Sequence, residues 1–182
     1  MEFHLHRGQC KLRTPDWWAA IVSGTIAAAV LMCAASAVIV ANSGSSWGAI
    51  RMVAAIVIGD RVFVEPGSHD AAMLAVALAV HLILAIGFSV ALAAIIEAFP
   101  LYFNLLMTSI IGIGFGASLY LLNFYAMTTI FPWFVDARTW INFSLHILYG
   151  LVAGISYIWI VRRNKSAIDA NGTRSARAES RS

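Results

Sequence analysis

Two histidines stand inside long apolar segments of this chain, and their type and position suit them for chemistry. At about 1.5 Å of rise per helical residue, His81 lies roughly 15 Å and His146 roughly 9 Å along its own segment. An ionisable group inside a membrane helix is costly, so it usually faces a protein interior or a cavity and marks a functional site. We therefore expect His81 and His146 to form a ligand or proton site.

Three interpretations of this histidine pair are open at the level of sequence. A neutral histidine can hydrogen-bond to a neighbouring helix and serve only in packing. It can bind a proton or a small ligand. Two facing histidines are also the minimum protein ligation for haem b or a metal ion, and His81 and His146 would then be the ligands. The haem interpretation is the only one that requires a cofactor.

Other polar residues lie near these histidines along the chain. Asn142 precedes His146 by four residues, so the two share one face of a helix. Asn123 lies toward the end of the preceding apolar segment, and we group both asparagines with the candidate ligand or proton site. Four charged residues lie in or beside the connections that we predict at the outer, non-cytoplasmic surface of the protein. There they either contact a ligand or anchor helices at the membrane interface. These outer-face candidates are Arg51, Asp60, Asp136 and Arg138.

Glycines recur every four positions in two of the apolar segments. Gly112 and Gly116 form a GxxxG step, and Gly150 and Gly154 continue the helical face of His146. Small residues at this spacing allow two membrane helices to approach closely. The sequence therefore predicts that these two segments pack against each other, either within one chain or between two chains.

The composition indicates that lipid is the solvent for most of these segments. Of the 182 residues, 60% are hydrophobic and 12% are charged, whereas roughly a quarter of the residues of a soluble domain are charged. The apolar residues occur in unbroken runs, and about 20 such residues cross the hydrocarbon core as a helix. We predict an all-α fold, an integral membrane four-helix bundle with spans at about 18–41, 71–96, 101–127 and 140–161.

The first of these runs also has features of a signal peptide. Ala35, Ser36 and Ala37 form an A-x-A-like cleavage site behind basic residues. The apolar run continues to Ala41, whereas the apolar core of a signal peptide ends at its cleavage site. This continuation favours a membrane span.

Three further segments complete the predicted domain organisation. Residues 47–59 are apolar but too short to span, so they should form an interfacial or re-entrant helix. Residues 1–16 form a polar arm. Residues 162–182 form a basic tail whose composition is typical of disorder.

The distribution of basic residues predicts the orientation in the membrane. The N-terminal arm carries three Lys or Arg residues and the C-terminal tail carries six. Positive residues near span ends are retained on the cytoplasmic side, so both termini should be cytoplasmic. The net charge of +3 follows from these termini, and without a basic face or motif we expect no nucleic-acid partner.

Three stretches together resemble a family of small, uncharacterised bacterial inner-membrane proteins with four spans. They are the mid-span His81, the sequence WGAIRMVAAIVIG from Trp47 to Gly59, and the sequence NFYAMTTIFPWFVDARTWINFSLHILYG from Asn123 to Gly150. The resemblance covers about residues 18–161 and implies a bacterial inner-membrane location. Some members bear a sodium:solute symporter label, although a chain this short lacks the large number of spans of such carriers. The resemblance implies no activity for any residue.

These patterns favour a protein that is not an enzyme. The sequence contains no Ser/His/Asp, HExxH or paired-carboxylate arrangement, and its two cysteines lack metal-ligand spacing. We expect a small carrier or an accessory subunit of a membrane complex, whose partners are the lipid bilayer and either further copies of the chain or a larger assembly. The alternative is an electron-transfer membrane protein that binds haem b or a metal through the two histidines.

Overall fold

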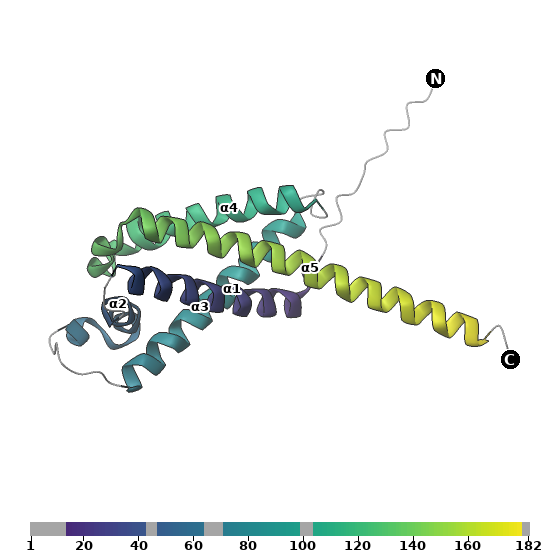
Figure 1. Ribbon diagram of the computed structural model, residues 1–182, viewed down its shortest axis with the longest axis horizontal. Helices are drawn as coiled ribbons and strands as arrows, with labels where there is room; N and C mark the ends of the chain where they lie inside the picture. Colours follow the sequence, from purple (N-terminus) through teal and green to yellow (C-terminus); the bar gives the residue numbers. More distant parts are fainter. Residues whose placement is uncertain (1–13, 43–46, 64–70, 99–103, 180–182) are drawn as a thin grey trace, which may run out of the picture.

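The chain is helical in each of the four parts that the computed structural model describes, residues 14–42, 47–63, 71–98 and 104–179 (Figure 1). Four of the described helices are long and apolar enough to cross a membrane, and a shorter apolar helix accompanies them. This arrangement confirms the prediction of an all-α bundle with the composition of a multi-pass membrane protein. The α-helices are α1 (Trp17–Ala41), α2 (Trp47–Ile58), α3 (Ala71–Ala98), α4 (Leu105–Leu121) and α5 (Trp140–Glu179).

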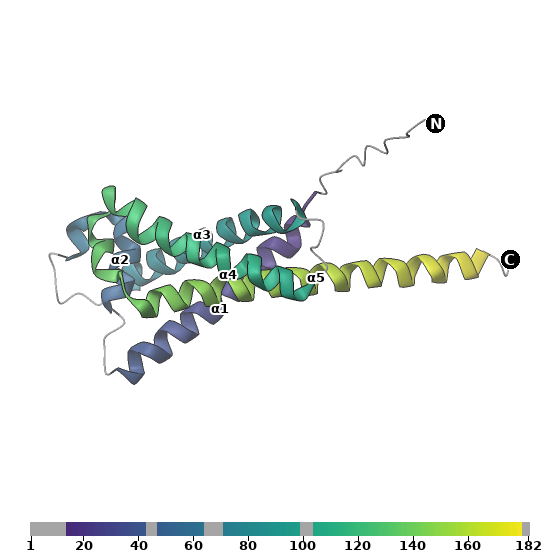
Figure 2. The ribbon, with the colours of Figure 1, turned by 90° about the horizontal axis from the view of Figure 1, so that it is seen from above.

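The bundle has two distinct ends. The short helix α2 lies at one end, and the later half of α5 extends beyond the other end (Figures 1 and 2). We refer to these as the α2 end and the terminal end. At the terminal end Asn164 donates a hydrogen bond of 3.1 Å to a carboxylate oxygen of Asp16. The start of α1 and this part of α5 therefore lie on the same side of the bundle, as an even number of spans requires.

Polar residues set several helix boundaries. Asp16 caps α1 by accepting from the backbone N–H of Ala19 at 3.0 Å. Asn104 caps α4 in the same way, accepting from the N–H of Leu106 at 2.9 Å. These side chains satisfy backbone donors that have no partner within the helix. Gly59 follows α2 with a φ of +88°, a left-handed conformation that ends helices and that glycine adopts without steric cost.

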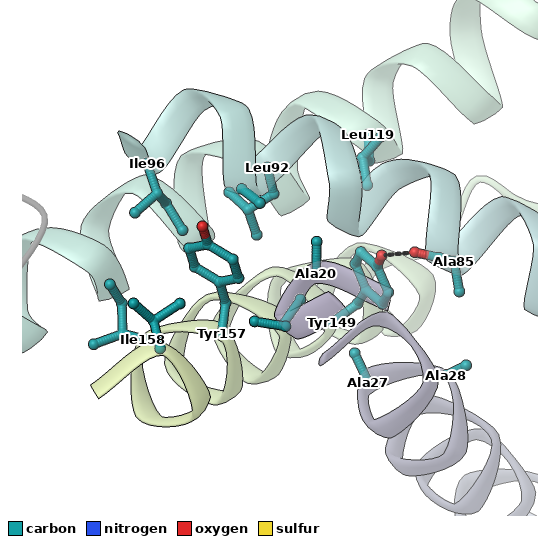
Figure 3. Packing of buried hydrophobic residues seen from close by; sticks show 14 residues of the cluster. Ala20, Ala27, Ala28, Ala85, Leu92, Ile96, Leu119, Tyr149, Tyr157 and Ile158 are labelled. Atoms are coloured by element: carbon teal, nitrogen blue, oxygen red, sulfur yellow. Dashed lines mark hydrogen bonds between the residues drawn. The ribbon is translucent and has the colours of Figure 1, made fainter. Parts of the chain in front are cut away.

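Small residues allow α1, α3 and α5 to pack closely. Ala20 and Ala27 of α1 are fully buried in the cluster that also holds Tyr149 of α5 (Figure 3). The Tyr149 hydroxyl donates to the backbone carbonyl of Ala85 in α3 at 2.5 Å. The buried Tyr149 hydroxyl thus has a partner on another helix, as a buried polar group needs where no water is present.

The helices α4 and α5 pack through the predicted glycines. A Cβ atom added to Gly112 would lie 2.5 Å from the carbonyl oxygen of Gly150, and one added to Gly116 would overlap the carbonyl of His146. At Gly154 the nearest atom would be the Thr108 methyl carbon, at 3.3 Å. The close contact lies within one chain, which is one of the two alternatives left open by the sequence.

The structure differs from the prediction in the span at 101–127. The α-helix α4 covers Leu105–Leu121, a π-helical turn η2 covers Leu122–Ala126, and a 3₁₀ turn η3 covers Met127–Thr129. A π turn holds one extra residue, so it shifts the side chains that follow it around the helix axis. Residues 101–103 lie outside the described residues.

The helix α5 also differs from the prediction, since its backbone stays helical through Glu179 where a disordered tail was expected. No proline follows Pro132, and the tail is rich in Ala, Arg and Ser. Ala and Arg are good helix formers, and extending an existing helix avoids the cost of nucleation. In the predicted polar arm 1–16, residues 1–13 lie outside the described part of the chain.

Candidate ligand-binding site

An apolar cavity of about 270 Å³ lies at the α2 end of the bundle, between α1, α2, α3 and α5. His81, Asn142 and His146 line it. A second cavity of about 360 Å³ adjoins the first, and His81, Asn123 and His146 line that one. The structure thus brings all four candidate ligand residues to one region. The residues that border both cavities are Leu31, Val53, His81, Phe124, Phe134 and His146.

Both ring nitrogens of His146 have partners. Nδ1 lies 2.7 Å from the backbone carbonyl oxygen of Asn142, and Nε2 lies 3.3 Å from the side-chain nitrogen of Asn123. A carbonyl oxygen can only accept, so Nδ1 carries the proton and Nε2 accepts from the Asn123 amide. This assignment from the hydrogen-bond network makes His146 a neutral imidazole that links α5 to η2.

The π turn η2 places Asn123 against His146, and Arg138 supports this turn. The Arg138 guanidinium donates to the backbone carbonyl of Phe124 at 2.6 Å and to the Thr128 hydroxyl at 3.0 Å. It also lies over the Tyr125 ring, 4.4 Å from the ring centroid. A π turn disrupts the normal pattern of helical hydrogen bonds, so Arg138 satisfies a carbonyl at that point. Arg138 is therefore a positioning residue for the site.

His81 differs from His146 in its hydrogen bonds. Its Nε2 atom is buried, and no described residue supplies a partner for it. The same ring makes a hydrogen bond with the backbone of Ala28 in α1. The two histidines therefore occupy one site with unequal roles: His146 is fully bonded within the protein, and His81 offers one nitrogen.

Aromatic rings enclose the α2 end of the site. The ring of Phe124 lies 5.2 Å and that of Tyr120 6.0 Å from the His146 ring, between centroids. Trp133 lies on the 3₁₀ turn η4 (Pro132–Ala137), and its indole N–H donates to the carbonyl of Met52 in α2 at 3.2 Å. This bond ties η4 to α2 beside the cavity.

The predicted outer-face charges lie at the same end but do not form the cavity walls. Asp60 is exposed on the 3₁₀ turn η1 (Asp60–Phe63), Asp136 is exposed on η4, and Arg51 is half-buried on α2. Neither these three residues nor Arg138 borders the two cavities, as far as the described residues show. Of these charged residues, Arg138 makes hydrogen bonds that support the turn that holds Asn123.

The described side chains around the two histidines do not fit a metal ion, and they fit haem only after a rearrangement. Within residues 14–42, 47–63, 71–98 and 104–179, no three His, Cys, Asp or Glu side chains form a group that could hold a metal ion. His81 and His146 would hold haem iron through their Nε2 atoms. The Asn123 amide faces Nε2 of His146, so it would have to move before that nitrogen could bind iron.

Two buried tyrosines were not identified from the sequence. Tyr149 bonds to α3 as described above. At the terminal end, the Tyr157 hydroxyl donates to Glu97 at 3.0 Å and accepts from the N–H of Asp16 at 3.2 Å. Tyr149, Ala153 and Tyr157 repeat every four residues, and this spacing could have indicated a second buried face of α5.

Comparison of the chain with protein-family models, with curated proteins and with solved structures found no match. The fold and the site therefore define the class of protein by themselves. In its described residues, the protein is an α-helical bundle with four membrane-compatible helices and an apolar cavity bordered by two histidines.

Proposed function

We propose that this chain is a membrane protein without enzymatic activity that binds a small, mostly apolar molecule between His81 and His146. It would act as a small carrier or as an accessory subunit of a larger membrane complex. We further propose a bacterial inner-membrane location with both termini in the cytoplasm. The excess of Lys and Arg at the termini supports this orientation, and the family resemblance supports the location.

The observation that carries this proposal is the composition of the cavity walls. Apolar side chains, those of leucine, phenylalanine, alanine, isoleucine, methionine and valine, form most of the surface, and two histidines and two asparagines are among the few polar groups. Ligand sites are commonly apolar concavities with a small number of convergent polar groups that orient the ligand. A histidine used only in packing would need no such space beside it.

The position of the cavity supports a ligand that arrives from the membrane. Its walls come from α1, α2, α3 and α5 and from the turns η2 and η4, and α1, α3 and α5 are long enough to cross a bilayer. His81 lies ten residues into α3, or roughly 15 Å at the helical rise per residue. A molecule that reaches this depth must dissolve in lipid or pass through the aromatic layer around Trp133.

Native mass spectrometry of the detergent-purified chain tests the proposal. Val53 borders both cavities from α2, so Val53→Trp should fill the space and remove any bound small molecule. Val57 lies on the same helix and is 67% exposed, so Val57→Trp is a matched control that should keep it. A bound mass that is present in the wild type and in V57W but absent in V53W supports the proposal. No bound mass in the wild type, even after incubation with 4-hexylphenol or hexylbenzene, contradicts it.

The size of the particle in mild detergent separates the two proposed roles. A particle made of several copies of this chain favours a carrier, and a stable complex with a second protein favours an accessory subunit. A particle of one chain alone would contradict both roles.

A further inference from the structure

The two histidines of the site differ in the hydrogen bonds of their Nε2 atoms. In His146 the proton on Nδ1 is donated to a backbone carbonyl, and Nε2 accepts from the Asn123 amide. In His81 the ring bonds to the backbone of Ala28, and no described residue reaches Nε2. The hydrogen bond that Asn123 supplies to His146 therefore has no counterpart at His81.

The bond to Ala28 fixes which nitrogen of His81 carries the proton. Ala28 lies in the middle of α1, where its N–H is used within the helix and its carbonyl keeps a second lone pair. The His81 ring must donate to this carbonyl, and it does so from Nδ1 because Nε2 has no partner. In a neutral imidazole the other nitrogen is then an acceptor. Nε2 of His81 thus offers a lone pair in the wall shared by both cavities.

We infer that the molecule bound here carries a hydroxyl group that donates a hydrogen bond to Nε2 of His81, while its apolar body occupies the two cavities. This inference rests on the proposed function and adds the chemical class of the ligand, a membrane-soluble phenol or alcohol. A ligand with only ether or carbonyl oxygens could not satisfy this nitrogen, because these groups accept and do not donate.

The volume of the site suits a ring with a short apolar chain. An apolar cavity of about 150 Å³ is large enough to bind benzene. The two cavities here measure about 270 Å³ and 360 Å³ and meet at the histidines. Phe124 and Phe134 border both of them, which provides aromatic surface for a planar ring.

Three matched compounds test the hydroxyl: 4-hexylphenol, 4-hexylanisole and hexylbenzene. The anisole keeps the oxygen without its hydrogen, and hexylbenzene lacks both. We expect the wild-type chain in detergent, measured by calorimetric titration, to bind the phenol about tenfold more tightly than either other compound, as one additional hydrogen bond predicts. His81→Leu should remove this preference, so that the phenol binds no more tightly than the other two compounds.

A second variant separates the hydrogen bond from a general effect on folding. His81→Gln keeps an acceptor oxygen on the side chain, so it should retain part of the preference for the phenol. Equal binding of all three compounds to the wild type would overturn the hydroxyl inference and leave the proposed binding function intact. A preference for the phenol that survives in H81L would overturn the role of His81. Failure of the wild type to bind any of the three compounds would remove the proposed function and this inference together.

Discussion

Replacing Gly112 with alanine is expected to force α4 and α5 apart. The new Cβ would lie 2.5 Å from the carbonyl oxygen of Gly150 and 2.9 Å from its carbonyl carbon. Ordinary contact between such atoms begins near about 3.5 Å, so the helices must separate by roughly 1 Å. Both opposing atoms belong to the backbone, and no side-chain rotation can relieve the overlap.

The expected cost follows from two opposing effects. Overpacking of a close contact costs about 1–3 kcal/mol, and alanine is about 1 kcal/mol more favourable than glycine in a helix interior. Gly112→Ala should therefore lower the free energy of unfolding by up to about 2 kcal/mol. Gly114 lies two residues away on the exposed side of α4 with no atom within 4 Å of an added Cβ. Gly114→Ala is the matched control, and it should leave stability unchanged or raise it.

Titration of the purified protein from mild detergent into dodecyl sulfate, followed by the loss of helical circular dichroism, measures both variants. The result expected is a lower unfolding midpoint for G112A than for G114A. Equal midpoints for the two variants would refute the view that α4 and α5 meet backbone to backbone at the glycines.

Three further substitutions probe the contacts around the site. Tyr149→Phe removes the bond to the Ala85 carbonyl and should lower the free energy of unfolding by about 1 kcal/mol in the same titration; an unchanged midpoint would mean that this bond contributes nothing. Trp133→Phe keeps an aromatic ring but removes the N–H that bonds to Met52. Hydrogen exchange should then become faster in α2 alone, and a uniform increase across all helices would contradict the local role of Trp133. His81→Leu should leave membrane insertion intact, because lipid tolerates leucine better than histidine; a loss of protease protection in membranes would disagree with this.

Apolar length was sufficient to predict the long helices. The runs beginning near Trp18, Ala71 and Trp140 carry almost no charge before their ends, so the prediction depended on composition alone. Two boundaries required more information. The residue types of the π turn at 122–126 are similar to those of the helix before it, so the local sequence does not indicate the turn. The turn is stabilised by Arg138, which lies further along the chain, after η4. The tail of α5 is helical because the preceding membrane-compatible helix continues into it. The composition of the tail alone does not indicate this.

The sequence indicated candidate residues for the site but not the hydrogen bonds that these residues make. Their positions inside apolar segments led us to expect that His81 and His146 form one site, and both border the same cavities. Their unequal hydrogen bonds were not predictable from spacing. They depend on the distance between η2 and α5, which brings Asn123 to His146, and on the approach of α1 to α3, which brings Ala28 to His81. Such distances between helices arise from packing and have no signature in a single segment.

Photolabelling tests the central claim, that the cavity beside the two histidines binds a membrane-soluble molecule, most directly. A 4-hexylphenol derivative with a diazirine in its alkyl chain would be activated in membranes that contain the protein, and the labelled residues would be located by mass spectrometry. We predict labels at cavity residues such as Leu31 and Phe134 and their loss in V53W. Labels spread over exposed residues such as Ile83 and Trp159, with the same pattern in V53W, would contradict the claim.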